Sequence, residues 1–434
     1  MSFGIRRRNK QYVADTQLFP PGIPNVYCLN RMKLLFLTRF EVEYELSMKI
    51  VPVTGAASDR LFVTMALPFY HRDPNYIRPL DADVHAVFDP KKNPRFQRGD
   101  CARWLLLDES GKPIGRIAAF FDERADDAEL WVGGCGFFEC IDNQNAADLL
   151  FDTAKAWLVE QGVEAMDGPI NFGNRERWWG LLVDGFHPPC YCCNYNPPYY
   201  QPLFERYGFE VYFKQFTYQR EISIPLSHRV GEKALRTLQD AGYTLSHIDP
   251  KQLEKAAEDF RSVYNDAWAR HEGVNPMSAE SAHKLIQSMK PIIDPKIIWF
   301  AYYQSKPVGF WVNIPDVNQL IVKYANGKLT LPGKIRFLWN RWRKRCKTMF
   351  GIVFGVVPEH QRKGVEAAIV VAATKVLQDP SQVKYEELQM NWIGDFNPKM
   401  MNVARYVGGT IYKTHHTYRY LFDRTKPFER HPIL

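Results

Sequence analysis

The sequence predicts an α/β protein in which one α/β unit is used twice. The chain has 434 residues, of which 46% are apolar and 24% charged, the balance of a folded globular protein. At roughly 150 residues per domain, this length favours two or three domains. Two short patterns also recur in the same order in both halves, which indicates that the halves share one fold.

The first repeated pattern is a strand, a tight turn and a second strand. Residues 112–115 (KPIG) and 306–309 (KPVG) each connect two apolar runs, as expected of a β-hairpin. The second pattern is a glycine, Gly208 or Gly408, that follows a helical segment and precedes a segment ending in Thr-Tyr. A glycine at that place is typical of a helix C-terminus.

These patterns predict two copies, at 48–225 and 226–425. Each has a leading helical region, a hairpin, a strand, a helix, a strand, a second helix and a final pair of strands. Residues 1–47 show no sustained periodicity, so we expect a poorly packed extension, or a translation start placed before a true one near Met48. Residues 426–434 are expected to form a short C-terminal tail.

The helix between the middle strands can be delimited in both copies. In the first copy, Asp142 is the expected N-cap and Gly162 the expected stop. In the second copy, residues 365–377 are apolar nearly all round, which predicts a buried helix, and Pro380 prevents its continuation.

The junction before this second helix has the features of an anion site. A buried-strand pattern at 352–357 runs into the turn 358–364 and then into the helix. The first N–H groups of a helix have no helical partner, and the helix dipole makes them attractive to anions. Gly364 would let a phosphate approach the backbone, and Arg362 and Lys363 add positive charge.

Residues 361–364 (Gln-Arg-Lys-Gly) resemble the Gln/Arg-x-x-Gly-x-Gly/Ala signature of the Gcn5-related N-acetyltransferase superfamily, in which this turn binds the pyrophosphate of acetyl-CoA. Five further stretches, at 73–80, 89–94, 168–172, 195–200 and 315–319, resemble a bacterial family of two-domain members of this superfamily. The likeness extends from about residue 48 to the end. It implies two tandem acyl-CoA N-acyltransferase domains, each a mixed, mostly antiparallel sheet flanked by helices.

The resemblance also implies which residues hold acetyl-CoA or another acyl-CoA as co-substrate. Asn397 follows an apolar strand and opens the last helix, where the superfamily commonly contacts the pantetheine arm or holds two strands apart. The backbone of the strand Phe354 to Val357 would hydrogen-bond that arm, and a backbone N–H near Val357 would polarise the thioester oxygen. The expected co-substrate residues are Val356, Val357, Gln361, Arg362, Lys363, Gly364, Val365, Ala367 and Asn397, with no metal.

The sequence departs from the superfamily pattern at two places. Glu366 stands at the third small position of the signature, where its carboxylate could repel pyrophosphate or point away and favour the helix N-terminus. Many superfamily members use a tyrosine four residues before the glycine of the last helix as a general acid. That position is Ala404 here and Phe204 in the first copy, and the nearby Tyr406 is out of register.

Three residues near the turn are candidate catalytic groups. Glu359 and His360 could each act as a general base toward an ammonium acceptor, directly or through water. Asp395 is a third candidate, although it could serve only as a cap for the last helix. Charged residues at strand ends are more often solvated than catalytic.

The first copy has no comparable turn. Its junction, residues 139–144, has no glycine, and Asp142 would cap the N–H groups that a pyrophosphate needs. We therefore expect a partner domain that does not bind the co-substrate and that shapes the acceptor cleft.

The resulting hypothesis is an acyl-CoA-dependent N-acyltransferase, with acetyl transfer to an amine as the first choice. Alternatives are a long-chain acyl transferase or an aminoacyl transferase that acts on a lipid or cell-wall acceptor. A long-chain acyltransferase would require an apolar channel beyond the thioester. An aminoacyl transferase using tRNA would require a strongly basic face and no phosphate turn. A CoA-sensing protein without turnover is the non-enzymatic alternative, to which Glu366 and Ala404 give some support.

The charge of the chain limits the kinds of partner that we expect. The net charge is +8, which favours anionic ligands, but no base-reading motif predicts nucleic acid. Residues 334–347 hold seven basic residues between aromatic and aliphatic ones, so they form either an exposed helix or a peripheral membrane contact. We expect a cytoplasmic protein that binds a small-molecule or lipid amine. The sequence does not indicate the oligomeric state.

Two loops contain further candidate site residues. Cys190 and Cys193 form one Cys-x-x-Cys pair without a second pair at zinc-site spacing, which favours a thiol-rich loop over a metal site. Residues 173–179 contain two arginines and two tryptophans and could line an acceptor pocket or a domain interface.

Overall fold

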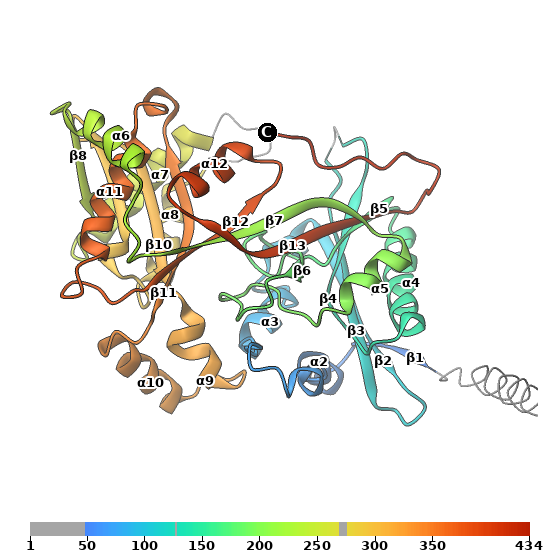
Figure 1. Ribbon diagram of the computed structural model, residues 1–434. Helices are drawn as coiled ribbons and strands as arrows, with labels where there is room; N and C mark the ends of the chain where they lie inside the picture. Colours follow the sequence, from blue (N-terminus) through green and yellow to red (C-terminus); the bar gives the residue numbers. More distant parts are fainter. Residues whose placement is uncertain (1–47, 126–127, 269–275) are drawn as a thin grey trace, which may run out of the picture. The chain divides into compact units, whose positions relative to one another are not determined.

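The computed structural model describes residues 48–125, 128–268 and 276–434. The predicted extension at 1–47 lies outside the described residues. Residues 48–434 form one compact unit, with the predicted mixed α/β architecture (Figure 1). The division near residue 225 stays a prediction, because one continuous sheet crosses it.

Thirteen strands of the described chain form this sheet, in the order β1-β2-β3-β4-β5-β13-β7-β12-β11-β10-β9-β8, with β6 paired to β13. Only β4–β5 and β11–β12 are parallel. The strands are β1 (Lys49–Pro52), β2 (Gly99–Leu107), β3 (Pro113–Asp122), β4 (Val132–Cys140), β5 (Ala165–Gly168), β6 (Leu181–Asp184), β7 (Glu210–Glu221), β8 (Tyr243–His247), β9 (Ile298–Tyr303), β10 (Lys306–Pro315), β11 (Thr348–Val356), β12 (Glu387–Gly394) and β13 (Thr410–Leu421).

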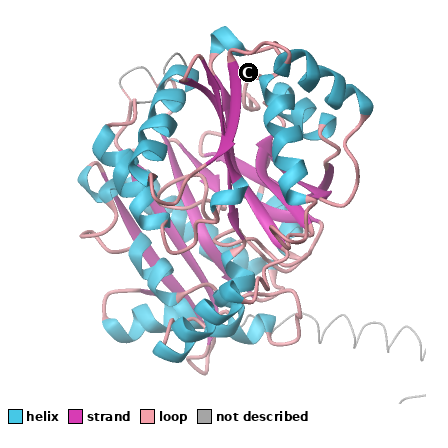
Figure 2. Ribbon diagram, turned by 90° about the vertical axis from the view of Figure 1, so that its left-hand side faces the viewer, coloured by secondary structure: helices cyan, strands magenta, loops and turns pink. Residues whose placement is uncertain are grey.

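Helices pack on both faces of the sheet (Figure 2). They are α2 (Ala56–Thr64), α3 (Asp81–Val87), α4 (Gln144–Glu160), α5 (Tyr200–Tyr207), α6 (His228–Leu238), α7 (Leu253–Trp268), α8 (Ala279–Met289), α9 (Lys323–Ala325), α10 (Leu331–Trp342), α11 (Val365–Leu377) and α12 (Pro398–Tyr406). Both predicted hairpins form, as β2–β3 and β9–β10. No helix of the described residues is long and apolar enough to cross a membrane.

The two copies exchange their last strands. β7, which ends the first copy, pairs with β12 of the second, and β13, which ends the second copy, pairs with β5 of the first. β7 and β13 also pair with each other, so they cross the middle of the molecule side by side (Figure 1). The predicted final pair of strands is thus one long strand in each copy, and the sheets are completed by each other's ends.

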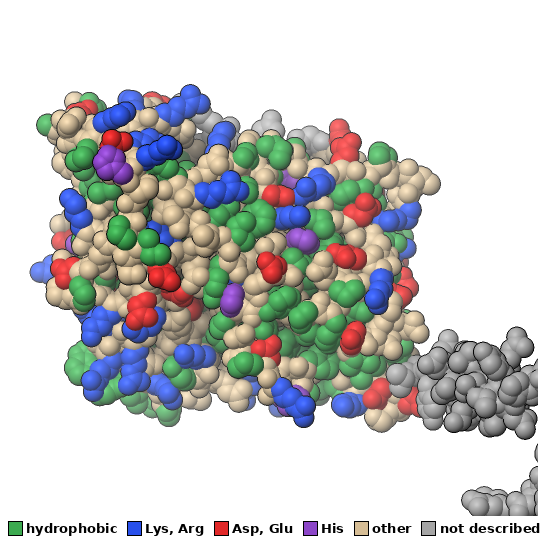
Figure 3. Space-filling view, in the orientation of Figure 1, with side chains coloured by type: hydrophobic (Ala, Val, Ile, Leu, Met, Phe, Trp, Pro, Cys, Tyr) green, Lys and Arg blue, Asp and Glu red, His purple; other side chains and the backbone are tan. Residues whose placement is uncertain are grey.

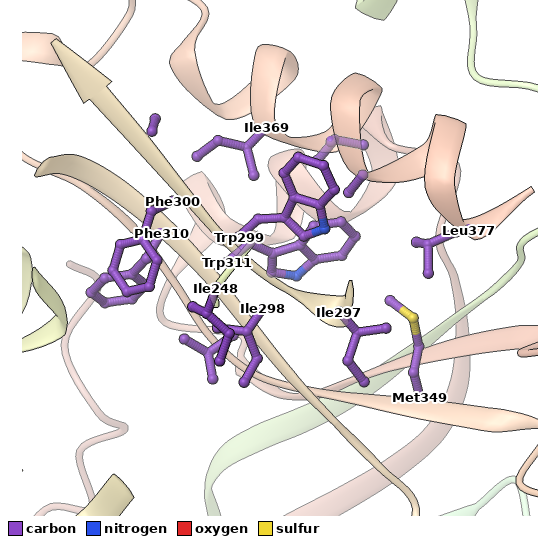
Figure 4. Close-up of a cluster of buried hydrophobic side chains, with 14 of the residues drawn as sticks. Ile248, Ile297, Ile298, Trp299, Phe300, Phe310, Trp311, Met349, Ile369 and Leu377 are labelled. Carbon is purple, nitrogen blue, oxygen red and sulfur yellow. The ribbon is translucent and has the colours of Figure 1, made fainter. Parts of the chain in front are cut away.

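Each copy has its own hydrophobic core. In the second copy, alternate residues of β10 face opposite helices, because side chains alternate along a strand. Phe310 packs against Phe260 of α7, with ring centroids 4.8 Å apart, whereas Trp311 lies with Val370 of α11. Figure 4 shows Trp311 among the residues of this core. α7 and α11 therefore cover opposite faces of the sheet.

The structure shows where the predicted helices α4 and α5 begin or end. Asn143, and not Asp142, caps α4, since its side chain accepts a hydrogen bond from the N–H of Ala146. Gly162 and Gly208 adopt positive φ beyond their helices, as predicted. The predicted tail is docked, because His431 stacks on Phe396 with ring centroids 4.1 Å apart.

Candidate functional site

The candidate site begins where β11 and β12 separate. These parallel strands pair only over residues 348–351 and 387–390. In the register with β10, Val353 and Gly351 have partners but Ile352 between them has none, so β11 bulges at that point. Beyond the bulge, the edge of β11 that would face β12 borders an opening.

An apolar cavity of about 340 Å³ fills this opening. Seventeen residues line it, and Asn391 and Asn397 carry the only polar side chains other than the Trp indoles. The others come from β10, β11, β12, α11, α12 and the β12–α12 turn: Trp311, Gly351, Ile352, Val353, Phe354, Val370, Met390, Trp392, Ile393, Gly394, Phe396, Met400, Val403, Ala404 and Val407. Such a lining suits an apolar chain with few polar groups.

β11 leads from this cavity to the predicted anion turn. Gly364 has φ +88° and directly precedes α11, and no side chain caps the helix. Arg362 also has positive φ, and both Arg362 and Lys363 are exposed. The turn thus presents first-turn N–H groups, the positive helix end and two cations, which together fit a pyrophosphate.

The turn is supported by α6, which sequence analysis did not connect with it. Thr237 Oγ1 donates to the carbonyl of Lys363 at 2.7 Å. A Cβ on Gly364 would lie 2.6 Å from that Oγ1 and 2.8 Å from the Lys233 carbonyl, so the close approach of α6 requires glycine there.

α6 also supplies an ion-pair partner for Glu366. Lys233 Nζ lies 2.8 Å from Glu366 Oε1, so the carboxylate is paired with a cation on the neighbouring helix. Because the pair offsets its charge, Glu366 is not a barrier to an anion at the turn. No pattern near the turn in the sequence identifies Lys233 as its partner.

The other predicted co-substrate residues surround this path in different ways. Gln361 Nε2 donates to the carbonyl of Val356 at 3.0 Å and holds the turn against β11. Val365 and Ala367 are buried where α11 packs. Asn397 caps α12 through the N–H of Met400 and also lines the cavity.

The N–H of Val357 itself donates to the carbonyl of Val308 at 3.0 Å, so this N–H is not available to polarise a thioester. That a backbone N–H near Val357 does so stays a prediction. Ile352 is the residue of β11 that lacks a strand partner and lines the cavity.

None of the three candidate catalytic residues lines the cavity. His360 Nδ1 lies 2.6 Å from Tyr243 Oη, on the β8–β9 side of β11, and burial lowers the pKa of its imidazole. Glu359 is exposed beside it. Asp395 accepts from the N–H of Lys214 at 3.1 Å and pairs with Arg430. Their catalytic roles stay predictions.

Ala404, at the position of the usual tyrosine, lines the cavity and is 1% exposed. Tyr406 points elsewhere, because its hydroxyl donates to the carbonyl of Arg229 at 2.8 Å. The small side chain at 404 therefore enlarges the cavity where a phenol would stand.

A buried polar network lies against β12 and was missed by sequence analysis. Asn391 donates to Cys193 Sγ at 3.2 Å and accepts from Thr217 Oγ1 at 2.7 Å. Lys413, 3% exposed, donates to Gln389 Oε1 at 3.0 Å. Since Asn391 also lines the cavity, the network reaches the candidate site. The polar residues at 389 and 391 within an apolar strand were the available signal.

Both thiols of the Cys-x-x-Cys pair, Cys190 and Cys193, take part in this network. Cys190 Sγ lies 3.0 Å from Gln389 Oε1. A hydrogen bond from Cys190 lowers the pKa of Cys193, and the same bond raises the pKa of Cys190. No group of three or more His, Cys, Asp or Glu side chains suited to a metal occurs among the described residues.

Residues 173–179 contact the second copy at the cavity edge. Trp392 Nε1 donates to the carbonyl of Arg175 at 3.1 Å. This contact supports the interface interpretation of the loop, and it places the loop beside a residue that lines the cavity.

The corresponding opening in the first copy is largely filled. β4 and β5 pair only over residues 132–134 and 165–167, and just beyond, the N–H of Ile170 donates to the carbonyl of Cys135 at 2.8 Å. There Glu139 pairs with Arg116 at 3.2 Å and accepts hydrogen bonds from Tyr70 and Tyr200. Burial raises the pKa of Glu139. The remaining cavity is about 80 Å³.

Known structures with the same architecture identify the fold. A tandem GNAT protein from the clavulanic acid biosynthesis pathway has a TM-score of 0.50 and 10% identity, covering 88% of this chain and 100% of its own. A GCN5-related glucosamine N-acetyltransferase region of a fungal multi-domain β-N-acetylglucosaminidase has a TM-score of 0.53 and 10% identity, covering 86% of this chain. This chain spans 38% of the fungal chain. The chain therefore has the tandem Gcn5-related N-acetyltransferase fold.

Two bacterial proteins match along most of the sequence. The "Bacterial ceramide synthase" of Caulobacter vibrioides is 27% identical over 86% of this chain and 97% of its own length. "Protein YghO" of Escherichia coli is 26% identical over 83% of this chain and 92% of its own. No family model matches the chain. Together with the fold, these relatives support an acyl-transfer role.

Proposed function

We propose that the protein is an acyl-CoA-dependent N-acyltransferase whose acceptor is the primary amine of a long-chain amino alcohol. One observation carries the proposal: the apolar cavity between β11 and β12 leads along β11 to an uncapped, cationic helix N-terminus. An acyl thioester of CoA combines an anionic pyrophosphate with an apolar acyl chain, so it matches both ends of this path.

The size and lining of the cavity favour an acyl chain longer than acetyl. Ala404 leaves space where superfamily members often carry tyrosine, and fifteen of the seventeen lining residues are apolar or glycine. The relative named as a ceramide synthase supports the same choice, since a ceramide is a long-chain amino alcohol acylated on nitrogen.

Each part of the site has a separate task. Arg362, Lys363 and the N-terminal N–H groups of α11 would bind the pyrophosphate, while Asn397 and the free edge of β11 would orient the pantetheine arm. Acyl-CoA would supply an activated carbonyl, the amine would displace the CoA thiolate, and the amine proton would pass to a base. Asn391 lies where the acyl cavity meets the buried polar network, and in this proposal it would orient the incoming amine.

Ligand-dependent unfolding tests the co-substrate site. We expect CoA and medium-chain acyl-CoA to raise the unfolding temperature, because a ligand at 100 times its Kd stabilises the folded state by about 2.7 kcal/mol. The double variant Arg362→Glu/Lys363→Glu should lose this shift, whereas Lys375→Glu at the far end of α11 should keep it. Substituting Gly364 is a poorer test, because its φ and the contact with Thr237 would also disturb folding.

Product analysis tests the reaction. Incubation with acyl-CoA and sphinganine should release CoA thiol and yield the amide, detected by mass spectrometry. If no CoA compound shifts unfolding at saturating concentration, or if the charge-reversal variant responds like the control, the proposed site is wrong.

CoA binding without turnover is a second candidate. It is favoured by the position of Glu359, His360 and Asp395, none of which lines the cavity. A clear CoA-dependent shift with no amide formed from short-chain or long-chain amines would favour this candidate over the enzyme.

A further inference from the structure

The connection between β10 and β11 carries an unusual concentration of positive charge. Residues 317–347 of this connection contain nine Lys or Arg and no Asp or Glu. Since the whole chain has a net charge of +8, the remainder sums to −1. The basic character of this protein therefore resides in one segment, which contains α9 and α10.

α10 is attached to the protein by one side only. Asn340, 1% exposed, donates from Nδ2 to the carbonyl of Leu320 at 2.8 Å. Phe337 packs against Val317, Ile321 and Val322. These contacts fix which face of α10 points away from the protein.

The outward face of α10 is apolar. Leu331, Ile335, Leu338 and Trp342 are 72%, 62%, 61% and 70% exposed, and Trp339 beside them is 47% exposed. At roughly 100° of rotation per residue, these five side chains occupy an arc about 100° wide, opposite Asn340. Seven of the seventeen exposed large hydrophobic residues of the described chain lie between Tyr324 and Trp342, so they form a cluster rather than scattered exposure.

Basic side chains border this apolar ridge on both flanks. The same helical rotation places Lys334 and Arg341 on one flank and Arg336 and Arg343 on the other. Lys334, Arg336 and Arg343 form no ion pair with a carboxylate in the described part of the chain. Arg343 lies over Trp339, with 4.8 Å between the guanidinium carbon and the ring centroid. Figure 3 shows blue and green side chains together at the lower left, where Figure 1 labels α10.

We propose that α10 docks this protein onto the surface of an anionic lipid bilayer. The apolar ridge would enter the boundary between headgroups and acyl chains, while the flanking cations contact lipid phosphates. A nucleic acid would match the charge but leave Leu331, Ile335 and Leu338 in water. A second copy of the chain would bring two strongly cationic segments together, which electrostatic repulsion opposes.

The proposed docking helix is connected to the candidate site through the chain. β11 begins six residues after Trp342, and its Ile352 lines the apolar cavity. A docked α10 would thus hold the cavity-forming strand near a membrane from which a long-chain substrate can enter. The docking itself does not depend on the proposed reaction.

Vesicle flotation of the full-length protein tests the inference without any activity measurement. We expect the protein to float with vesicles of phosphatidylcholine and phosphatidylglycerol, to float weakly with phosphatidylcholine alone, and to be released by high salt. The variants Ile335→Ser/Leu338→Ser/Trp342→Ser and Lys334→Glu/Arg336→Glu/Arg343→Glu should each weaken binding at least about tenfold.

Matched controls separate α10 from general surface effects. Val159→Ser/Leu285→Ser removes exposed apolar side chains from other helices, and Arg60→Glu/Lys91→Glu/Lys112→Glu reverses exposed charges of the first copy; both should bind like the unmodified protein. All variants should keep its unfolding temperature. The inference is overturned if the unmodified protein ignores anionic vesicles, if the α10 variants bind as well as the controls, or if they instead abolish a dimer or RNA binding.

Discussion

The two copies share the order hairpin, strand, helix, strand, helix and long final strand, yet only the second keeps an opening. In the second copy, β11 and β12 diverge around a cavity of about 340 Å³, and Gly364 leaves the start of α11 uncapped. In the first copy, the equivalent space holds about 80 Å³, and the Asn143 side chain caps α4. A pair of short parallel contacts is thus common to both copies, whereas an available ligand site requires that neither the opening nor the helix end be used by the protein itself.

The filled copy has a structural task instead. Its β5 pairs with β13, and its β7 pairs with β12, so it completes the sheet on which the cavity is built. The buried Glu139–Arg116 pair and its tyrosines line the small cavity that remains in this copy. The first copy therefore supports the second through shared strands.

Exchanging one residue between the copies should have the largest effect. Ala404 and Phe204 lie four residues before Gly408 and Gly208, at equivalent places in α12 and α5. Phe204 is 0% exposed, so Phe204→Ala should destabilise the protein by ~3–5 kcal/mol, measured by urea unfolding. Ala404→Phe should place a ring in the cavity and weaken medium-chain acyl-CoA binding at least about tenfold, measured by calorimetry.

The contrast between the two substitutions is the control. Phe204→Ala should leave the affinity for acyl-CoA within a factor of about two, provided that the measurement is made well below the unfolding temperature. Unchanged affinity in Ala404→Phe would mean that the acyl chain does not use the cavity.

The sequence predicts the second copy's junction because every feature of it is local. Gly364, Arg362 and Lys363 stand together between a strand and a helix, and α11 has the predicted bounds at Val365–Leu377. The repeat likewise predicts both hairpins and the helix ends at Gly208 and Gly408. The predicted fold class and the tandem fold are confirmed by the structural comparisons.

Features that join distant residues could not be predicted in the same way. Lys233 and Glu366 are 133 residues apart, and the exchange of β7 and β13 depends on which strand edges are free in the folded molecule. The cavity arises from a bulge at Ile352 and the divergence of two strands, which no local pattern encodes. The single-residue error at the α4 cap, Asp142 for Asn143, reflects two adjacent residues that can both accept a capping hydrogen bond.

The strand exchange can be probed by pH through His415 on β13. Its side chain is 5% exposed, and burial lowers its pKa to about 4. The unfolded state therefore binds the proton more tightly than the folded state. The free energy of unfolding is thus unaffected by His415 above about pH 6.5, and it decreases as the pH falls toward 4. At pH 5 the loss should be on the order of 2 kcal/mol.

Urea unfolding at pH 7.5 and pH 5 measures this loss. His415→Gln can still donate to the Asn194 carbonyl, which His415 Nε2 contacts at 3.2 Å, but it cannot bind the proton. The variant should thus lose less stability between the two pH values than the unmodified protein. An equal loss in both would show that the protonation of His415 does not control the stability of the exchanged strand.

The smallest expected effect compares two matched helix caps. Asn143 accepts from the N–H of Ala146 at 3.0 Å, and Asn397 accepts from the N–H of Met400 at 3.1 Å. Asn143→Ala and Asn397→Ala should each cost about 1 kcal/mol of stability. Only Asn397→Ala should also weaken CoA binding in calorimetry, because Asn397 lines the cavity.

Uncapping α4 should create no second CoA site, since its junction has neither a glycine nor a basic residue to replace Gly364, Arg362 and Lys363. A second bound CoA in Asn143→Ala would show that the cap alone keeps the first copy from binding.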